Sequence, residues 1–406
     1  MKELFTLGDL FVSDFLAEGE IPRGGRHEMK MMLEENSGLV RLEKSAPLDT
    51  MYGKYWYRSG INNTMRNELK GIVDSVLSVT KHKENDIWID IASNDGTLLS
   101  FVPPTFVKVG IDPVDDSFKS ESEQHSDLII QDYFSSDVYK KSKFGSQKAK
   151  VVTSIAVFYD IEDPNKFIRD VSEILDEDGL WVLQLSYTPL MIEQMAFDNI
   201  CHEHIYYYSL FNLKEMMEKN GFRVVDCQLN DINGGSFRVY VMKESGNVSK
   251  FGTQPYRDVC DFRVKSIVGY EKSLSLDSEK IWKDFFQRIL DLKEETVSFI
   301  KKEKSEGKKI CGYGASTKGN TLLQYFGLDH TLIDSIAERS KYKWGLKTVG
   351  TNIPIISEEQ MRKENPDYLL VLPWHFINEF TERESEFLSN GGKFIVPCPK
   401  FEIIGK

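Results

Sequence analysis

Cysteine is scarce in this 406-residue chain, and none occurs in the first 200 residues. The five cysteines lie far apart and form no Cys-x-x-Cys pair; they are Cys201, Cys227, Cys260, Cys311 and Cys398. An odd number of widely spaced thiols is typical of reduced cysteines rather than of a disulfide framework. The usual structural zinc site, which is built from Cys-x-x-Cys pairs, is excluded as well.

Long hydrophobic runs and excess positive charge are also missing. No stretch approaches the roughly 20 uninterrupted apolar residues that a membrane span needs. The first ten residues lack the basic-then-apolar order of a signal peptide. The chain has 51 Lys and Arg against 63 Asp and Glu, a net charge of −12, which disfavours a nucleic-acid partner. We therefore expect a cytoplasmic protein that binds neither nucleic acid nor a membrane.

What the sequence does contain is an alternation of strand-length apolar runs with helical patterns. The apolar runs begin at Asp86, Val107, Val151, Leu180, Lys309, Thr331, Tyr368 and Lys393. Near-continuous apolar strands separated by helices indicate parallel α/β sheets. The chain is too long for one ordinary core. We expect two Rossmann-like α/β domains, at 65–245 and 246–406, after a small N-terminal domain at 1–64.

The first candidate site is the turn after the strand that begins at Asp86. This strand ends in Ala92-Ser93-Asn94-Asp95-Gly96, and a helical pattern follows. Ligands of open α/β sheets bind outside the carboxyl ends of the strands, where small residues let a cofactor approach the backbone. The next strand ends in Asp112-Pro113, where an acid can accept hydrogen bonds from ribose hydroxyls. The alternative is that Asn94-Asp95-Gly96 is only a tight turn.

The densest group of reactive side chains is Cys201-His202-Glu203-His204, which Tyr206-Tyr207-Tyr208 follows closely. Histidine and glutamate suit proton transfer near neutral pH, and a tyrosine hydroxyl can donate to an enolate oxygen. If the segment is extended, His202 and His204 share one face and Glu203 points to the other. Two alternatives stay open: a solvated aromatic loop, and a metal site on Cys201, His202 and His204.

Two further motifs combine a turn with a basic residue. Asn233-Gly234-Gly235 predicts a hairpin turn, and the nearby Arg238 can lean on a carboxylate or a phosphate. Gly312-Tyr313-Gly314-Ala315 follows a strand and precedes a helix, which is the context of a phosphate site, and Lys318 adds a charge for a diphosphate. Glu338 lies where a dinucleotide enzyme keeps its ribose-binding acid, so a nicotinamide-dependent oxidoreductase stays open.

Several motifs in this order resemble the nucleotide-sugar C-methyltransferase family. They are Asn94–Leu99, Phe158–Pro164, Gln184–Tyr187, Cys201–His204, Asn233–Ser236, Gly312–Ala315 and Pro366–His375. The resemblance implies a class I methyltransferase Rossmann-like domain and a C-terminal Rossmann-like α/β domain for a nucleotide-diphosphate sugar. It also implies S-adenosylmethionine as cofactor and methylation of a ring carbon of a 4-keto deoxysugar.

The resemblance implies a role for each matching position. His204 is the implied general base, with Glu203 beside it, and we place His202 and Tyr206 in the same catalytic group. The residues expected to bind the cofactor are Tyr57, Ser59, Ala92, Ser93, Asn94, Asp95, Gly96, Leu98, Asp112 and Pro113. The residues expected to bind the substrate are Arg238, Tyr313, Gly314, Ala315, Lys318 and Asn320.

The sequence departs from the family pattern at three points. Family members usually begin with a domain that holds zinc through four cysteines, but Glu34–Val40 stands in its place here, so we expect no metal. Ala92 replaces the usual glycine. Cys201 stands where a tyrosine is often found, so a donor role would pass to Tyr206 or another tyrosine. Methylation of a sugar oxygen stays the alternative reaction, and we expect a monomer or a homodimer.

Overall fold

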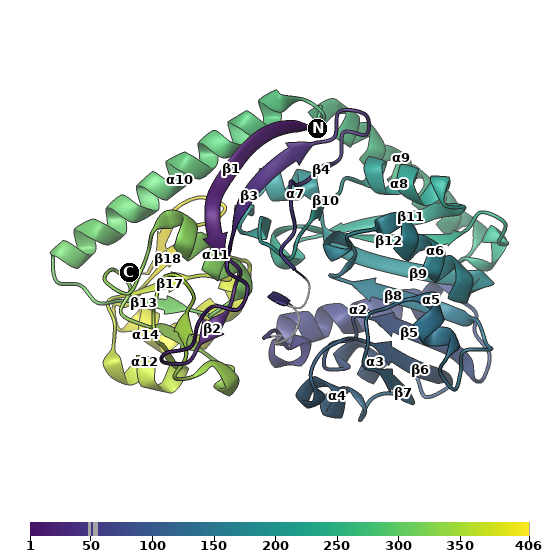
Figure 1. Ribbon diagram of the computed structural model, residues 1–406, viewed down its shortest axis with the longest axis horizontal. Coiled ribbons are helices and arrows are strands. Elements are labelled where there is room, and N and C mark those ends of the chain that lie inside the picture. The colour runs from purple at the N-terminus through teal and green to yellow at the C-terminus, as the bar shows by residue number, and fades with distance from the viewer. Residues whose placement is uncertain (48–49, 52–55, 406) are drawn as a thin grey trace.

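The computed structural model describes residues 1–47, 50–51 and 56–405. Two large sheets form two lobes that lie side by side, and two long helices run along one edge of the molecule (Figure 1). A smaller sheet of N-terminal strands lies beneath the helix α10. The chain therefore has the two α/β lobes that the sequence predicts.

The first lobe is built on a seven-stranded sheet with the order β11-β12-β9-β8-β5-β6-β7. Its parallel strands are β5 (Asp86–Ile91), β6 (Phe106–Ile111), β7 (Leu128–Ile130), β8 (Ala149–Ile155) and β9 (Leu175–Ser186). The antiparallel hairpin of β11 (Phe222–Asn230) and β12 (Ser236–Lys243) lies at one edge. This is the class I methyltransferase arrangement that the resemblance implies, and the hairpin turn at Asn233–Gly235 is confirmed.

Helices cover both faces of this sheet because their apolar residues recur every three or four positions. α2 (Asn63–Val79) buries Ile72 against one face, and α6 (Pro164–Ile174) buries Val171 against the other. The remaining helices of this lobe are α3 (Thr97–Phe101), α4 (Asp116–Ser122), α5 (Ser136–Lys140), α7 (Thr188–Glu193) and α8 (Leu210–Lys219). Both faces of the parallel strands are thus covered, which explains their continuous apolar runs.

The C-terminal lobe is built on a six-stranded sheet with the order β16-β14-β13-β17-β18-β19, of which only β19 is antiparallel to its neighbour. Its strands are β13 (Ile310–Tyr313), β14 (Ile336–Glu338), β16 (Ile355–Ser357), β17 (Tyr368–Val371), β18 (Lys393–Val396) and β19 (Glu402–Ile404). Its short helices are α11 (Thr317–Phe326), α12 (Glu358–Glu364), α13 (Ile377–Arg383) and α14 (Ser385–Ser389). The strand expected from Thr331 begins only at Ile336, because Thr331 forms a turn on Asp329.

A pair of long helices connects the lobes. α9 (Gln254–Leu274) packs on β11 and α8, whereas α10 (Glu279–Ser305) packs on β1 and shares the core of the C-terminal lobe. The break between them includes Ser275, whose φ of 53° is left-handed. The lobes therefore separate at Ser275 rather than at residue 245, because α9 keeps Ile267 in the core of the first lobe. Within the described residues, no helix is long and apolar enough to cross a membrane.

The N-terminal strands share sheets and core with both lobes. The N-terminal sheet contains, in order, β1 (Lys2–Phe11), β3 (Arg26–Leu33), β4 (Val40–Leu42) and, from the first lobe, β10 (Tyr206–Tyr207). β2 (Phe15–Leu16) pairs instead with β15 (Lys347–Thr348) of the C-terminal lobe. Phe5 of β1 stacks on Phe286 of α10 with ring centroids 4.7 Å apart. The segment expected as a small domain at 1–64 thus joins the two lobes.

Glu271 anchors α9 to the first lobe. Its carboxylate accepts hydrogen bonds from Tyr187 Oη at 2.7 Å and from the backbone N–H groups of Leu210 and Phe211 at 2.6 and 2.7 Å. Removing the carboxylate leaves three buried donors without an acceptor, so we expect Glu271→Ala to lower the free energy of unfolding by about 3 kcal/mol. Urea unfolding followed by far-UV circular dichroism measures the change.

Lys265→Ala, on the exposed side of the same helix, is the control. Surface substitutions of this kind change stability by about 0.5 kcal/mol or less. If the two variants lose the same stability, Glu271 is not an anchor.

Candidate active site

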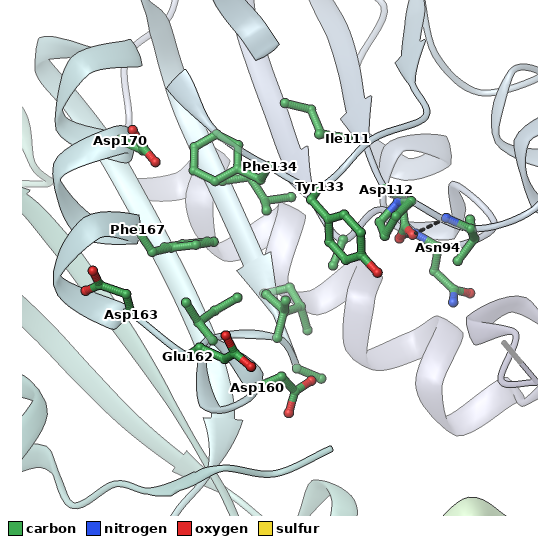
Figure 2. Close-up of a pocket in the computed structure, with 18 of the residues that line it drawn as sticks. Asn94, Ile111, Asp112, Tyr133, Phe134, Asp160, Glu162, Asp163, Phe167 and Asp170 are labelled. Carbon is green, nitrogen blue, oxygen red and sulfur yellow. Dashed lines mark hydrogen bonds between the residues drawn. The ribbon is translucent and has the colours of Figure 1, made fainter. Parts of the chain in front are cut away.

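A cavity of about 380 Å³ opens outside the carboxyl ends of β5, β6 and β8, where open α/β sheets bind ligands. Its apolar wall includes Ile111, Phe134 and Phe167, with Tyr133 beside them (Figure 2). The volume falls in the range of small-molecule sites, about 300–1,000 Å³. The cavity is therefore the first candidate for a cofactor site.

The turn between β5 and α3 has a backbone that few side chains tolerate. Ala92 and Asn94 are left-handed, with φ of 62° and 51°. A Cβ atom at Gly96 would lie 2.8 Å from Cα of Ser122, so this position needs glycine. Ala92 pays about 1 kcal/mol relative to glycine in this conformation. This strain gives a physical reason for the glycine that is usual at this position in the family that the sequence resembles.

Asp112, at the end of β6, ties this turn in place. Its Oδ2 accepts a hydrogen bond from the Asn94 N–H at 2.8 Å, and its Oδ1 accepts one from the Val114 N–H at 3.1 Å (Figure 2). Burial raises the pKa of Asp112 to about 6, because desolvation outweighs these two hydrogen bonds. The side chain is therefore ionised at neutral pH and lines the cavity as an acceptor.

Acidic side chains predominate around the first cavity. The carboxylates that line it are Asp112, Asp160, Glu162, Asp163 and Asp170. Among the described residues of the lining, Lys166 is the one cation, and it pairs with Asp170 at 2.6 Å. Such a lining attracts a positively charged ligand and repels a polyphosphate.

The segment from Tyr57 to Gly60 lies over the turn and is bound to it. The backbone N–H groups of Ser59 and Gly60 donate to Asn94 Oδ1 at 3.0 Å and to Asp95 Oδ2 at 2.7 Å. Asn94 Nδ2 donates in return to the carbonyl oxygen of Tyr57 at 2.9 Å. The structure thus places Tyr57 and Ser59 on the wall of the first cavity, and Tyr57 also lines a second one.

The second cavity, of about 130 Å³, lies at the carboxyl ends of β13, β14 and β17. Its lining includes four basic residues, Arg58, Arg339, Lys343 and Arg383, and two acidic ones, Glu338 and Glu358. The Arg58 guanidinium lies between Phe118 of the first lobe and Tyr342 of the C-terminal lobe, 3.8 and 4.4 Å from the ring centroids. This cavity therefore spans the two lobes. Each of its four cations is already paired with a carboxylate: Arg58 with Glu121, Lys343 with Glu338, and Arg339 and Arg383 with Glu379.

His204 lies in the seam, which is the buried contact between the lobes that also includes Asn199, Asn233 and Lys318. Its Nδ1 is 2.8 Å from the carbonyl oxygen of Asn199, so this nitrogen carries the proton and donates it, which leaves Nε2 as an acceptor. Burial and the charge of Lys318 lower the pKa of His204 to about 3. The ring packs 4.1 Å from the ring of Tyr159. The imidazole is therefore neutral and its Nε2 is an acceptor, and the lowered pKa makes it a weak base as long as the site holds no ligand.

Lys318 enters the seam from α11 of the C-terminal lobe. Its Nζ donates to Asn199 Oδ1 and, at 3.4 Å, to the carbonyl oxygen of Asn233, both in the first lobe. Several buried polar atoms nearby have no hydrogen-bond partner among the described residues; they include Asp198 Oδ1, Glu203 Oε2, Tyr207 Oη and His375 Nδ1. Buried polar atoms without partners are rare in folded proteins, and their gathering here indicates a ligand site.

Two of the predicted catalytic residues lie elsewhere. The ring of His202 faces His27 of β3, with centroids 6.0 Å apart, and burial lowers the pKa of His202 to about 4. Glu203 and His204, by contrast, share Lys318 as an electrostatic neighbour. The segment turns instead of extending, so the arrangement of faces expected for an extended segment does not apply. Tyr206 Oη accepts from Arg41 at 3.3 Å and donates to the Glu162 carbonyl at 3.4 Å.

Three of the predicted substrate residues, Tyr313, Gly314 and Ala315, line the second cavity, and three do not. Arg238 is buried under α2, where it donates to Glu68 at 2.6 Å, so its role is to pair with a carboxylate. Asn320 holds the N-terminal segment, because its Nδ2 donates to Ser13 Oγ at 2.8 Å. Lys318 points into the seam.

Of the ten predicted cofactor residues, six line the first cavity: Tyr57, Ser59, Ala92, Asn94, Asp112 and Pro113. The other four shape the turn from behind. Leu98 belongs to the core under α2, and Asp95 accepts hydrogen bonds from the backbone of Gly60 and Thr97. Ser93 is buried, and Gly96 contacts Ser122.

Sequence reasoning missed Asn199, Tyr207, Asp160 and His375 as members of the seam. Asp160 and His375 belong to motifs that carry the family resemblance, so their motifs were the available signal. Tyr207 was one of three adjacent tyrosines with nothing to single it out. Asn199 acts through both its backbone oxygen and its side chain, which no sequence pattern shows.

Two family models match consecutive parts of the chain. A methyltransferase domain matches residues 61–226, and a C-methyltransferase C-terminal domain matches residues 231–399. The C-methyltransferase NovU of Streptomyces niveus is 29% identical over 367 residues, which are 90% of this chain and 85% of that protein.

Among solved structures, an S-adenosylmethionine-dependent methyltransferase from Clostridium acetobutylicum aligns with 46% of this chain and 94% of its own, at 13% identity and a TM-score of 0.34. The plantazolicin methyltransferase BpumL, in complex with SAH, aligns with 44% of this chain and 82% of its own, at 10% identity and a TM-score of 0.34.

Asp112 provides a test of the first cavity. We expect Asp112→Asn to weaken the binding of S-adenosylhomocysteine about tenfold, because hydrogen bonds to a charged acceptor contribute about 1.5–3 kcal/mol. Isothermal titration calorimetry measures the affinity. Asp115→Asn is the matched control, since Asp115 caps α4 three residues further on and does not line the cavity. An unchanged affinity in Asp112→Asn would remove Asp112 from the cofactor site.

The raised pKa of Asp112 also predicts a pH dependence. Protonation removes acceptor capacity from the carboxyl group, so the affinity for S-adenosylhomocysteine should fall as the pH is lowered through about 6. The affinity of Asp112→Asn should lack this inflection, because its amide does not titrate. Titrations between pH 5 and pH 8 compare the two proteins, and an identical inflection in both would assign it to another group.

Proposed function

We propose that this chain, an S-adenosylmethionine-dependent methyltransferase of the C-methyltransferase family, methylates a ring carbon of a nucleotide-linked 4-keto deoxysugar. The observation that carries the proposal is a buried, neutral histidine held beside Asn199 and Lys318 where the two lobes meet, together with one cavity in each lobe. His204 lies in the seam, the acidic cavity opens in the first lobe, and the basic cavity opens toward the C-terminal lobe.

The charge and the volume of the first cavity support S-adenosylmethionine as its ligand. Asp112 is placed to accept hydrogen bonds from ribose hydroxyls, and the surrounding carboxylates suit a cation. Ala92 and Asn94 of the left-handed turn line the cavity. When bound, the cofactor supplies an electrophilic methyl group whose bond to sulfur breaks with its electron pair left on sulfur.

Basic side chains and a helix N-terminus in the second cavity support a site for a nucleotide diphosphate. Four basic residues line it, and Ser316 and Thr317 at the start of α11 lie in the same lining. Backbone N–H groups at a helix N-terminus bind phosphate oxygens. The Gly312–Ala315 turn would then serve the acceptor substrate rather than a nicotinamide cofactor.

His204 is the base of the proposed reaction. The proton on a carbon beside a ketone is acidic only when the enolate is stabilised, so the base must act together with a donor to oxygen. Neutral Nε2 takes this proton, while the hydrogen bond from Nδ1 to Asn199 holds the ring in the required tautomer. Burial in the seam keeps competing water from the reaction.

Tyr207, rather than Tyr206, suits the donor role that a tyrosine at the position of Cys201 would have. Tyr207 is buried beside Cys201, Asp160 and Glu203, and its hydroxyl has no partner among the described residues. Burial raises the pKa of Tyr207 well above its usual value, so the hydroxyl keeps its proton and can donate it in a hydrogen bond.

The test is mass spectrometry of reactions that contain S-adenosylmethionine and nucleotide-linked keto-sugars. The panel includes the thymidine and uridine diphosphate forms of 4-keto-6-deoxyglucose. We expect a product one methyl heavier, with fragmentation that locates the methyl group on a ring carbon. A methyl group on oxygen, without exchange of the carbon-bound proton in D₂O, would replace the proposal with sugar O-methylation.

Substitution of His204 separates the chemical step from binding. We expect His204→Asn to lose both methylation and deuterium exchange by at least about 100-fold, because proton transfer by a positioned base contributes about 10²–10⁴-fold. The affinity for S-adenosylhomocysteine should stay within a factor of three, since His204 does not line the first cavity.

His202→Asn is the matched control, because His202 is a buried histidine two residues away that faces His27. It should keep deuterium exchange within about threefold of the unaltered protein. If deuterium exchange survives in His204→Asn and is lost in His202→Asn, His202 rather than His204 is the base.

A further inference from the structure

Lys318 does not lie where a diphosphate ligand would need it. It is the second residue of α11, next to Thr317 of the second cavity, but it is absent from the described lining of that cavity. Its side chain instead crosses the seam and donates to Asn199 and Asn233 of the other lobe. The C-terminal lobe therefore contributes a cation to the base rather than to the basic cavity.

The surroundings of Lys318 are those of a buried, compensated cation. Burial lowers the pKa of Lys318, whereas the carboxyl groups of Asp198, Asp160 and Glu203 and the thiol of Cys201 raise it. The imidazoles of His204 and His375 face the same charge. A buried cation held among carboxyl groups is costly unless each side is paired, so such a cluster favours a ligand that completes the pairing.

One N–H of the ammonium group is available to a ligand. A lysine ammonium has three donors, and those of Lys318 reach the Asn199 side chain and, more weakly, the Asn233 carbonyl. In the part of the chain that the structure describes, no third acceptor lies within hydrogen-bond distance. Asn199 Oδ1 holds Lys318 while the carbonyl oxygen of the same residue holds His204 Nδ1. One asparagine thus sets the distance between the cation and the base.

We propose that Lys318 is a catalytic residue whose ammonium group binds the ketone oxygen of the acceptor and stabilises the enolate. This inference rests on the proposed function. As His204 Nε2 takes the proton from the neighbouring carbon, the C–H electron pair forms the C=C bond and the C=O π pair moves to oxygen, beside Lys318. Formation of the new C–C bond then restores the C=O bond, and the proton on His204 passes to solvent.

The test measures deuterium exchange at the carbon beside the ketone, with S-adenosylhomocysteine bound so that methyl transfer is absent. The acceptor probe is the member of the keto-sugar panel that turns over fastest. We expect Lys318→Met to lower the exchange rate at saturating acceptor about 100-fold or more, which is the effect of losing one oxyanion donor. The concentration of acceptor for half-maximal exchange and the affinity for S-adenosylhomocysteine should change less than threefold.

Two further variants separate charge from structure. Lys318→Arg keeps a positive charge and should exchange at least ten times faster than Lys318→Met. Arg288→Met removes another cation that spans the lobes, since Arg288 of α10 donates to the carbonyl oxygens of Ile192 and Glu193. It should exchange at the rate of the unaltered protein, because Arg288 contacts neither cavity nor the seam cluster.

Four results would overturn the assignment. Unchanged exchange at saturation with a tenfold weaker acceptor would return Lys318 to diphosphate binding. Equal losses in Lys318→Met and Arg288→Met would show that lobe docking is responsible instead of the charge. Equal rates in Lys318→Met and Lys318→Arg would do the same. If the unaltered protein methylates oxygen and catalyses no exchange, the proposed function itself fails, and the enolate role of Lys318 fails with it.

Discussion

A single buried ammonium group is the constraint on which the rest of the structure depends. Lys318 gives up its hydration in the seam, and this loss is offset only when Asn199 and the nearby carboxyl groups of the first lobe surround it. The lobes must therefore dock in one register, because a small slip would leave a buried charge without partners. The helices α9 and α10 and the shared N-terminal sheet hold the lobes in this register, and α11 contacts the Phe197–Asn199 turn of the first lobe.

Each lobe uses the same backbone device in different electrostatic surroundings. In the first lobe Asp112 accepts from the Asn94 N–H, and in the C-terminal lobe Glu338 accepts from the Ala315 N–H at 2.8 Å. Both acids follow the second strand of their sheet and tie down the turn after the first strand. The remaining lining differs, since carboxylates surround Asp112 whereas basic groups predominate around Glu338. Charge rather than fold therefore distinguishes the two sites, which is why the Gly312–Ala315 motif alone left a nicotinamide cofactor open.

Periodicity and turn chemistry were sufficient to predict four strands of each sheet, the hairpin turn at Asn233–Gly235 and the turn that Asp112 holds. These features depend on neighbours in the sequence, and local patterns record such neighbours. The seam depends on contacts between distant residues, which local patterns do not record. Arg238 meets Glu68 and Lys318 meets Asn199 only after folding, so the sequence left a carboxylate or a phosphate open for Arg238 and predicted a diphosphate for Lys318. For the same reason the predicted junction at residue 245 lies before the observed one at Ser275, because Glu271 anchors α9 to the first lobe through contacts with Tyr187 and α8.

Tyr57 belongs to the walls of both cavities, and a wall common to two sites makes their occupancies thermodynamically linked. If the first ligand repositions Tyr57, the free energy of that change is already included in its own binding and does not enter the binding of the second ligand. Such a linkage is reciprocal: a change in donor affinity caused by the acceptor must equal the change in acceptor affinity caused by the donor. The affinity measured for either ligand therefore depends on whether the other one is bound.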